Sequence, residues 1–292
     1  MTENARIVAS HGRTYIVELA DGSKRICSTR GKKTDFACGD RVVIKISNAE
    51  QAVIEKVIAR ETLLYRSDEW KSKLIAANVT QIVIVVAPVP SWLDELIGRC
   101  LIAAESAGIK PVICLNKCDL PEAAAARDKL AAYQKLGYEL VAISAQEDLL
   151  PLREKLRGHV SVLVGQSGMG KSTITNALIP DANARINDIS IALDSGKHTT
   201  THATLYHLDA ESDLIDSPGL QSFGLAHIQP EDLVHYMPDF RDYIGQCRFH
   251  NCRHRQEPNC AILGAVADKN IPASRLELLH RLQDELARVS AY

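Results

Sequence analysis

Long apolar runs, a secretory leader and abundant cysteine are all missing from this sequence, and each absence narrows its class. The longest uninterrupted apolar run, residues 82–89, is far shorter than the roughly 20 residues that cross a bilayer. The first six residues lack the apolar core of a secretory signal. Eight cysteines in 292 residues are too few for a disulfide scaffold. We therefore expect a cytoplasmic protein with reduced thiols and no membrane partner.

Excess charge of either sign is also lacking. The chain has 34 Lys and Arg against 36 Asp and Glu, a net charge of -2, and its 46% hydrophobic content excludes wholesale disorder. Residues 1–66 nevertheless hold 12 basic and 8 acidic side chains, a net charge of +4 that leaves -6 for the remainder. This segment is the better candidate for contact with a polyanion, although +4 also fits an ordinary solvated surface.

The pattern of short runs divides the chain into parts of different architecture. Residues 6–60 alternate β-prone runs with turns, which predicts a small antiparallel barrel of either the OB or the SH3-like type. Residues 81–86 form a continuous apolar run, as expected for a strand buried on both faces of a parallel sheet. Helices and strands then alternate, which predicts a doubly wound sheet with ligands at the strand C-termini. We expect helices at residues 93–107, 121–136, 149–157 and 171–178, and strands at residues 111–115, 140–143, 160–164, 203–208 and 213–215.

Beyond residue 223 the pattern becomes irregular around a Cys/His cluster and ends in an apolar stripe at helical spacing, residues 273–289. The fold class we predict is therefore multidomain. It comprises a β-barrel at residues 1–66, an α/β P-loop domain at 67–224, and a metal-binding module with helices at 225–292.

A phosphate-binding loop follows the apolar strand at residues 160–164 and leads into a helical segment. Glycines let the backbone N–H groups of such a loop turn toward phosphate oxygens, while the next helix presents its positive end. Lys171 would reach the β and γ phosphates, and the Ser172 hydroxyl would ligate Mg²⁺. The loop matches GxxxxGKS with Gly165, Gln166, Ser167, Gly168, Met169, Gly170, Lys171 and Ser172.

A second motif, of the NKxD type, directly follows the strand predicted at residues 111–115, where a nucleotide base would lie. The Asp119 carboxylate would accept from the N1–H and the exocyclic amine of guanine, and adenine offers no matching pair of donors. Lys117 would pack its stem on the base, and Asn116 would tie this loop to the phosphate loop. The motif consists of Asn116, Lys117, Cys118 and Asp119, and the triplet Ser144, Ala145 and Gln146 resembles the element that supports the base through a backbone N–H.

Two further segments follow the phosphate loop. Asp216, at the end of a short apolar strand, would hold Mg²⁺ through water, and the Gly219 N–H would sense the γ-phosphate. One of Thr199, Thr200 and Thr201 would complete the Mg²⁺ coordination, and the sequence leaves open which. In ordinary GTPases the phosphate loop comes first and the base-reading motif last, so this chain is circularly permuted. Its switch segment then leads almost at once into the C-terminal module.

The group that activates the attacking water is not evident. Leu220 stands where many GTPases place a glutamine, and leucine cannot orient water. We predict weak intrinsic hydrolysis, with His198 or a group supplied by a partner positioning the water, and Gln221 as a weaker substitute. A solvent-exposed loop histidine is an equally good interpretation of His198. The candidate catalytic residues are His198, Thr200, Asp216 and Gly219.

Three cysteines and a histidine lie within fourteen residues near the C-terminus. Three thiolates and one imidazole suit a closed tetrahedral Zn²⁺ site, which is structural because no position stays open for a substrate. The metal would fold a segment too short to bury its own core. His250 is a rival for the imidazole ligand. The candidate ligands are Cys247, Cys252, His254 and Cys260; the other five cysteines show no ligand spacing.

Taken together, the barrel, the permuted motifs and the Cys-Cys-His-Cys cluster resemble the bacterial small ribosomal subunit biogenesis GTPases, the RsgA family, over nearly the whole chain. The resemblance favours His254 over His250 and adds Thr173 to the phosphate loop. It implies an OB-fold N-terminal domain, GTP hydrolysis stimulated by the small ribosomal subunit, and a role in late maturation of that subunit. It rests on residues 76–79, 116–119, 165–173, 196–201, 216–219 and 247–260.

Three hypotheses follow from these motifs. The first is a subunit-stimulated GTPase, in which GTP orders the switch, the ordered form docks on rRNA and hydrolysis releases it. The second is a metal-stabilised nucleic-acid-binding regulator that uses GTP as a ligand with negligible hydrolysis. The third is a small-molecule P-loop kinase, against which the NKxD motif argues. We expect bound GTP or GDP with Mg²⁺, one Zn²⁺ per chain, the small subunit and its rRNA as partners, and a monomer.

Overall fold

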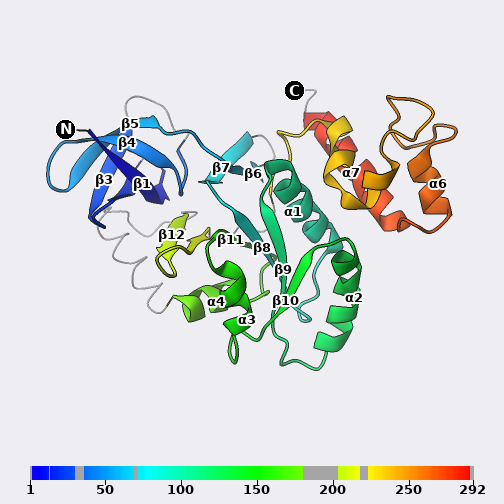
Figure 1. Ribbon diagram of the computed structural model, residues 1–292, viewed down its shortest axis with the longest axis horizontal. Helices are drawn as coiled ribbons and strands as arrows, with labels where there is room; N and C mark the ends of the chain where they lie inside the picture. The colour runs from blue at the N-terminus through cyan, green and yellow to red at the C-terminus, as the bar shows by residue number, and fades with distance from the viewer. Residues whose placement is uncertain are drawn as a thin grey trace.

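The computed structural model describes residues 2–12, 14–29, 36–68, 71–179, 203–217 and 223–289. The described residues form an N-terminal barrel, a central layer of parallel strands flanked by helices, and a C-terminal group of helices (Figure 1). The multidomain architecture predicted from the sequence is confirmed. The domain boundaries expected at residues 66 and 224 stay predictions.

The N-terminal barrel is a closed ring of five strands in the order β1-β2-β3-β5-β4, with β1 also pairing with β4. Strands β3 and β5 run parallel and the other pairs antiparallel, which is the OB arrangement and not the SH3-like one. Alternate residues such as Ile7, Val17 and Ile44 point inward and are buried. The strands are β1 (Thr2–His11), β2 (Thr14–Leu19), β3 (Lys24–Thr29), β4 (Arg41–Ile46) and β5 (Gln51–Val57).

The central sheet has the strand order β10-β9-β8-β11-β13, all parallel, with β12 antiparallel beside β13. All six residues of β8 are buried, as the continuous apolar run predicts. The strands are β8 (Gln81–Val86), β9 (Lys110–Leu115), β10 (Glu139–Ala142), β11 (Val160–Val164), β12 (Thr204–His207) and β13 (Asp213–Asp216).

Helices cover both faces of this sheet. Ile97 and Leu130 of the first two helices pack with Ile84 on one face, and Leu152 and Ile174 of the next two pack on the other. Each helix begins and ends within two residues of its predicted bounds. The helices are α1 (Asp94–Ala107), α2 (Ala123–Lys135), α3 (Leu150–Leu156) and α4 (Lys171–Leu178).

Two features of the fold were not predicted from the sequence. One is a separate hairpin of β6 (Leu63–Asp68) and β7 (Lys71–Ala77) that spans the expected boundary between the first two domains. The other is the pairing of barrel strand β1 with β12 of the central sheet, which makes one continuous eleven-stranded sheet. The barrel and the central domain are therefore joined by backbone hydrogen bonds as well as by the chain.

The C-terminal module contains two short 3-10 helices, η1 (Pro230–Tyr236) and η2 (Pro238–Tyr243), followed by α6 (Ala261–Ala267) and α7 (Ala273–Val289). Helix α7 packs closely on α1, because Gly98 leaves room for the Leu278 side chain. A buried ion pair joins Arg275 Nη2 to the Asp239 carboxylate at 2.7 Å. Within the described residues, no helix combines the length and the apolar character that a membrane crossing requires.

Candidate nucleotide and metal sites

The loops singled out in the sequence converge at the C-terminal edge of the parallel strands. Asn116 follows β9 and is 1% exposed. Its Nδ2 donates to the Met169 carbonyl at 2.9 Å, and its Oδ1 accepts from the Ala145 N–H at 3.0 Å. One buried carboxamide thus ties the NKxD loop to the phosphate loop and to the loop after β10.

The phosphate loop is folded around the amine of Lys171, which donates to the carbonyls of Gly165 at 2.5 Å and Gln166 at 2.9 Å. Gly170 has φ 93°, and a Cβ there would lie 2.3 Å from Asn116 Nδ2, so only glycine fits. Ser172 and Thr173 are exposed in the first turn of α4. Their side chains are therefore outside the core, at the N-terminal end of α4, and helix N-termini attract anions.

Two opposite charges face each other beside this loop. Burial lowers the pKa of Lys171, an effect that the negative charge of Asp216 opposes. Burial also raises the pKa of Asp216, at the end of β13, and the Lys171 charge opposes that shift. Both charged groups are desolvated, so a polyanion beside Lys171 and a divalent cation beside Asp216 would be favoured. The residues present therefore fit Mg²⁺ with a nucleotide.

The NKxD loop leaves its carboxylate accessible. Asp119 is exposed, whereas the backbone of Cys118 is fixed by a 3.0 Å hydrogen bond to the Ile143 carbonyl. Lys117 has φ 60° and its amine donates to the Val89 carbonyl at 2.8 Å. Ser144 Oγ is buried and has no hydrogen-bond partner among the described residues. A buried hydroxyl and an exposed carboxylate on two adjoining loops fit a polar ligand at this edge.

Several sequence-predicted catalytic residues fall outside the described part of the chain. These are His198, Thr200 and Gly219, together with Leu220 and Gln221. Asp216 is the one candidate catalytic residue that is placed.

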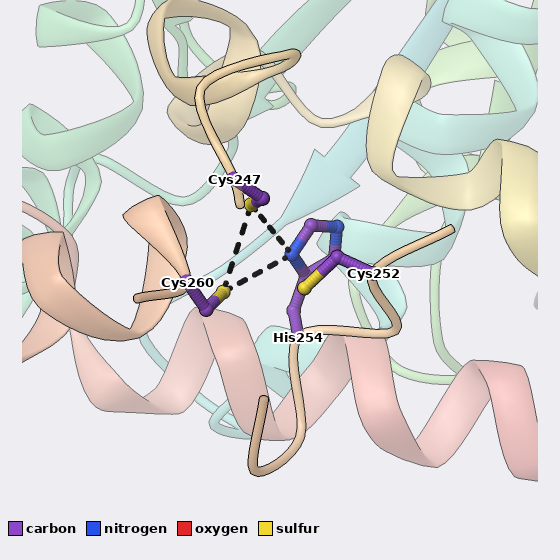
Figure 2. A group of neighbouring side chains, drawn as sticks. All are labelled: Cys247, Cys252, His254 and Cys260. Atoms are coloured by element: carbon purple, nitrogen blue, oxygen red, sulfur yellow. Dashed lines mark hydrogen bonds between the residues drawn. The ribbon is translucent and has the colours of Figure 1, made fainter. Parts of the chain in front are cut away.

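The metal-ligand candidates come together in the C-terminal module (Figure 2). One ligand atom from each of Cys247, Cys252, His254 and Cys260 lies within 4.8 Å of the others. His254 Nδ1 is 3.3 Å from Cys260 Sγ and 3.7 Å from Cys247 Sγ, and those two sulfurs are 3.8 Å apart. Bond lengths to zinc of about 2.3 Å for sulfur and about 2.0 Å for nitrogen give tetrahedron edges of about 3.8 and 3.5 Å. The donor set therefore fits Zn²⁺, and among the described residues His250 is not in the cluster.

The loop between these ligands is shaped by a carboxylate that the sequence analysis missed. Glu257 accepts hydrogen bonds from the backbone N–H groups of Arg253, Arg255 and Gln256 at 2.8, 2.8 and 3.1 Å. Burial opposes the shift, but these donors lower the pKa of Glu257 to about 2. His280 Nε2 also lies 2.8 Å from the His254 carbonyl, so helix α7 supports the ligand backbone.

Within the part of the chain that the structure describes, the other five cysteines do not join a group of candidate metal ligands. Four of them are buried, and Cys118 is half-buried. Burial raises the pKa of all four buried thiols, to about 11 for Cys27 and about 12 for Cys38 and Cys100, and it raises that of Cys114 as well. These four groups are protonated at neutral pH.

The loops occupy the same edge of the sheet, but along the chain the NKxD loop precedes the phosphate loop. This arrangement defines a circularly permuted P-loop GTPase, which here carries an OB barrel and a Cys₃His module. The description "RsgA GTPase" belongs to the family model that matches residues 57–226. Curated relatives named "Small ribosomal subunit biogenesis GTPase RsgA" include one from Neisseria meningitidis serogroup C, 57% identical over 98% of this chain and 93% of the relative. Another, from Nitrosospira multiformis, is 52% identical over 94% and 88%.

Solved structures agree with the sequence relatives. YjeQ from Thermotoga maritima is 30% identical with a TM-score of 0.76 over 98% of this chain and 99% of that one. YloQ, described as a circularly permuted GTPase, is 25% identical with a TM-score of 0.72 over 99% and 96%. The chain therefore belongs to the RsgA GTPase family and is a GTP hydrolase.

Proposed function

We propose that this GTPase acts in the maturation of the small ribosomal subunit and that the subunit stimulates its hydrolysis of GTP. The relatives at 57% and 52% identity carry that biological role in their names and cover nearly the whole chain. The observation that carries the enzymatic part is the Asn116 carboxamide, which holds the base loop and the phosphate loop in one unit.

The described residues divide the work of binding. Asp119 selects guanine, Lys117 supports the base, and the loop after β10 presents the Ala145 backbone. Lys171 and the backbone N–H groups of the phosphate loop hold the phosphates, with Ser172 and Asp216 toward Mg²⁺. Mg²⁺ held by these residues would neutralise negative charge on the phosphates. The further binding contacts that we propose come from Cys118, Ser144, Gly165, Gln166, Ser167, Gly168, Met169, Gly170 and Thr173.

The hydrolytic step is proposed to be slow without a partner. Leu220 replaces a water-orienting glutamine, and we assign the positioning of the water to His198 or to a group of the bound subunit. Thr200 would complete the Mg²⁺ site and the Gly219 N–H would report the γ-phosphate. A His198→Ala variant with unchanged stimulated turnover would remove that histidine from the mechanism.

The flanking modules would bind the subunit. The barrel at residues 1–66, with net charge +4, would read rRNA by backbone charge and shape. The zinc module at residues 225–292 would be a rigid docking element whose metal is structural, with one Zn²⁺ per chain. We further propose a monomer that acts in the cytoplasm. Zinc analysis well below one ion per folded chain would contradict the metal assignment.

The decisive experiment measures phosphate release from GTP with and without purified small subunits. We expect at least a tenfold rise in turnover with small subunits, no comparable rise with large subunits, and no competition by ATP. A Lys171→Met variant is the control for contaminating activity. GTP-dependent subunit binding without any phosphate release would overturn the proposal and favour a GTP-responsive regulator.

A further inference from the structure

The barrel is built into the same sheet as the candidate Mg²⁺ residue. Ala9 of β1 pairs with Thr204 of β12, and Thr204 in turn pairs with Asp216 of β13. The Ser10 N–H also donates to the Ala203 carbonyl at 3.2 Å. A single row of the sheet thus runs from the barrel to Asp216, and β12 lies between the barrel and the rest of the central sheet (Figure 1).

A cluster of charged and polar side chains also connects the barrel to the β12–β13 pair, next to the backbone pairing of β1 with β12. Arg6 Nη1 lies 2.5 Å from Asp213 Oδ2, and the other oxygen of Asp213 is 2.6 Å from His207 Nδ1. His207 Nε2 then lies 2.8 Å from Glu18 Oε1, and Lys24 Nζ lies 3.6 Å from the other oxygen of Glu18. In this cluster the β12–β13 pair supplies Asp213 and His207, and barrel residues contact them from both sides. The Asp213 and Arg6 side chains are only 10% and 27% exposed, so the ion pair between them is the best shielded contact of the cluster.

A second contact reaches the residue before Asp216. Gly39, in the barrel's connection before β4, has φ 92°, and a Cβ there would meet the Ala77 carbonyl oxygen at 2.2 Å and Ile215 Cδ1 at 3.4 Å. The Gly39 backbone therefore packs directly against the Ala77 carbonyl at the end of β7, with the Ile215 side chain of β13 beside it. The barrel thus touches β13 through the Arg6–Asp213 ion pair and through the Ile215 side chain.

We infer that the barrel positions Asp216, with Arg6 and Glu18 as positioning residues for hydrolysis, and that a partner held by the barrel acts on the nucleotide through β12 and β13. This inference rests on the proposed function. The loops for the base and for the phosphates follow β9 and β11, which lie beyond β13 from the barrel in the strand order. Base and phosphate binding is therefore insulated from the barrel, whereas Mg²⁺ coordination is not.

The test compares Arg6→Met with the conservative Arg6→Lys in the full-length protein. The control is Arg41→Met, which removes a barrel arginine whose carboxylate partner, Glu61 at 3.2 Å, is exposed. Three quantities are measured: the affinity for a fluorescent GDP analogue without Mg²⁺, the slowing of its release by Mg²⁺, and kcat for GTP.

For Arg6→Met we expect the Mg²⁺-free affinity to stay within about twofold. We expect the Mg²⁺ effect on release and kcat to fall about tenfold, because misplacement of a reacting group by about 1 Å is this costly or more. Arg6→Lys should recover most of both, and Arg41→Met should match wild type. A wild-type Mg²⁺ effect and kcat in Arg6→Met would overturn the inference.

If Arg6→Met loses its thermal unfolding transition, Glu18→Gln carries the test, because it leaves the Arg6–Asp213 pair intact, and a wild-type Mg²⁺ effect in it overturns the inference. A wild-type protein that neither binds guanine nucleotide nor hydrolyses GTP would refute the proposed function itself. Normal wild-type hydrolysis with an unaffected Arg6→Met refutes only the role of the barrel.

Discussion

Removing the Asn116 carboxamide tests the architecture of the nucleotide site most directly. Alanine at this position leaves the Met169 carbonyl and the Ala145 N–H, both now bonded to Asn116, without partners in a buried setting. Each orphaned group costs about 1–3 kcal/mol, and partial relaxation places the combined cost at about 3 kcal/mol. A domain of this size loses about 2–4 °C of Tm per kcal/mol, so we expect a fall of about 6–12 °C.

The same cost should appear in nucleotide binding, because the two loops lose their common anchor. If the site must be re-formed on binding, about 3 kcal/mol weakens the affinity for a fluorescent GDP analogue roughly 100-fold. The matched control is Asn48→Ala, which likewise removes two hydrogen bonds to the backbone: Asn48 Oδ1 accepts from the Glu50 and Gln51 N–H groups at 2.9 and 2.8 Å, but in an exposed barrel turn where water can replace it. An Asn116→Ala protein with Tm within about 2 °C of wild type and affinity within about twofold would refute the reasoning.

Three further perturbations have definite expected outcomes. In nucleotide competition, Asp119→Asn should change the preferred base from guanine to xanthine, because xanthine carries a carbonyl that can accept a hydrogen bond from the new amide. An unchanged preference for GTP would contradict the base assignment. Zinc chelation should raise the number of cysteines that react with a thiol reagent in the native protein from about one to about four of the eight, since the other four thiols are buried and protonated. No rise in this number would place the metal elsewhere. Gly170→Ala should weaken GTP binding at least tenfold in a filter or fluorescence assay, because its Cβ would lie 2.3 Å from Asn116 Nδ2. Gly158→Ala, with φ 72° and open space around it, should leave binding unchanged, and equal losses in both would mean that backbone strain alone is responsible.

The parts of the fold that local sequence patterns encode were predictable. The bounds of β8 and α7 follow directly from the sequence. A strand buried on both faces is a continuous apolar run, and a helix buried along one stripe has apolar residues at helical spacing. The phosphate loop and the NKxD loop were readable for a different reason. Each is contiguous in the chain, so its chemistry appears in a few adjacent residues.

Features that depend on distant pairing left no such record. The choice between an OB and an SH3-like barrel is decided by the parallel pairing of β3 with β5, a register that hydrophobic alternation does not encode. The pairing of β1 with β12 joins residues about two hundred positions apart. Likewise, Arg6 and Asp213 are ordinary charged residues in the sequence, and their roles appear only when β1 and β13 are placed together.

Circular permutation explains why both flanking modules reach the switch side of the sheet. In this order, β13 is the last strand of the central sheet, and the chain returns at Phe223, which is fully buried, and at Gly224, whose N–H donates to the Tyr65 carbonyl of β6 at 2.9 Å. The described chain therefore stops just after β13 and resumes in contact with the hairpin that follows the barrel. A nucleotide-dependent change at the end of β13 would act on the N-terminal modules as directly as on the C-terminal one. The permutation thus makes the central domain a link between the barrel and the C-terminal module.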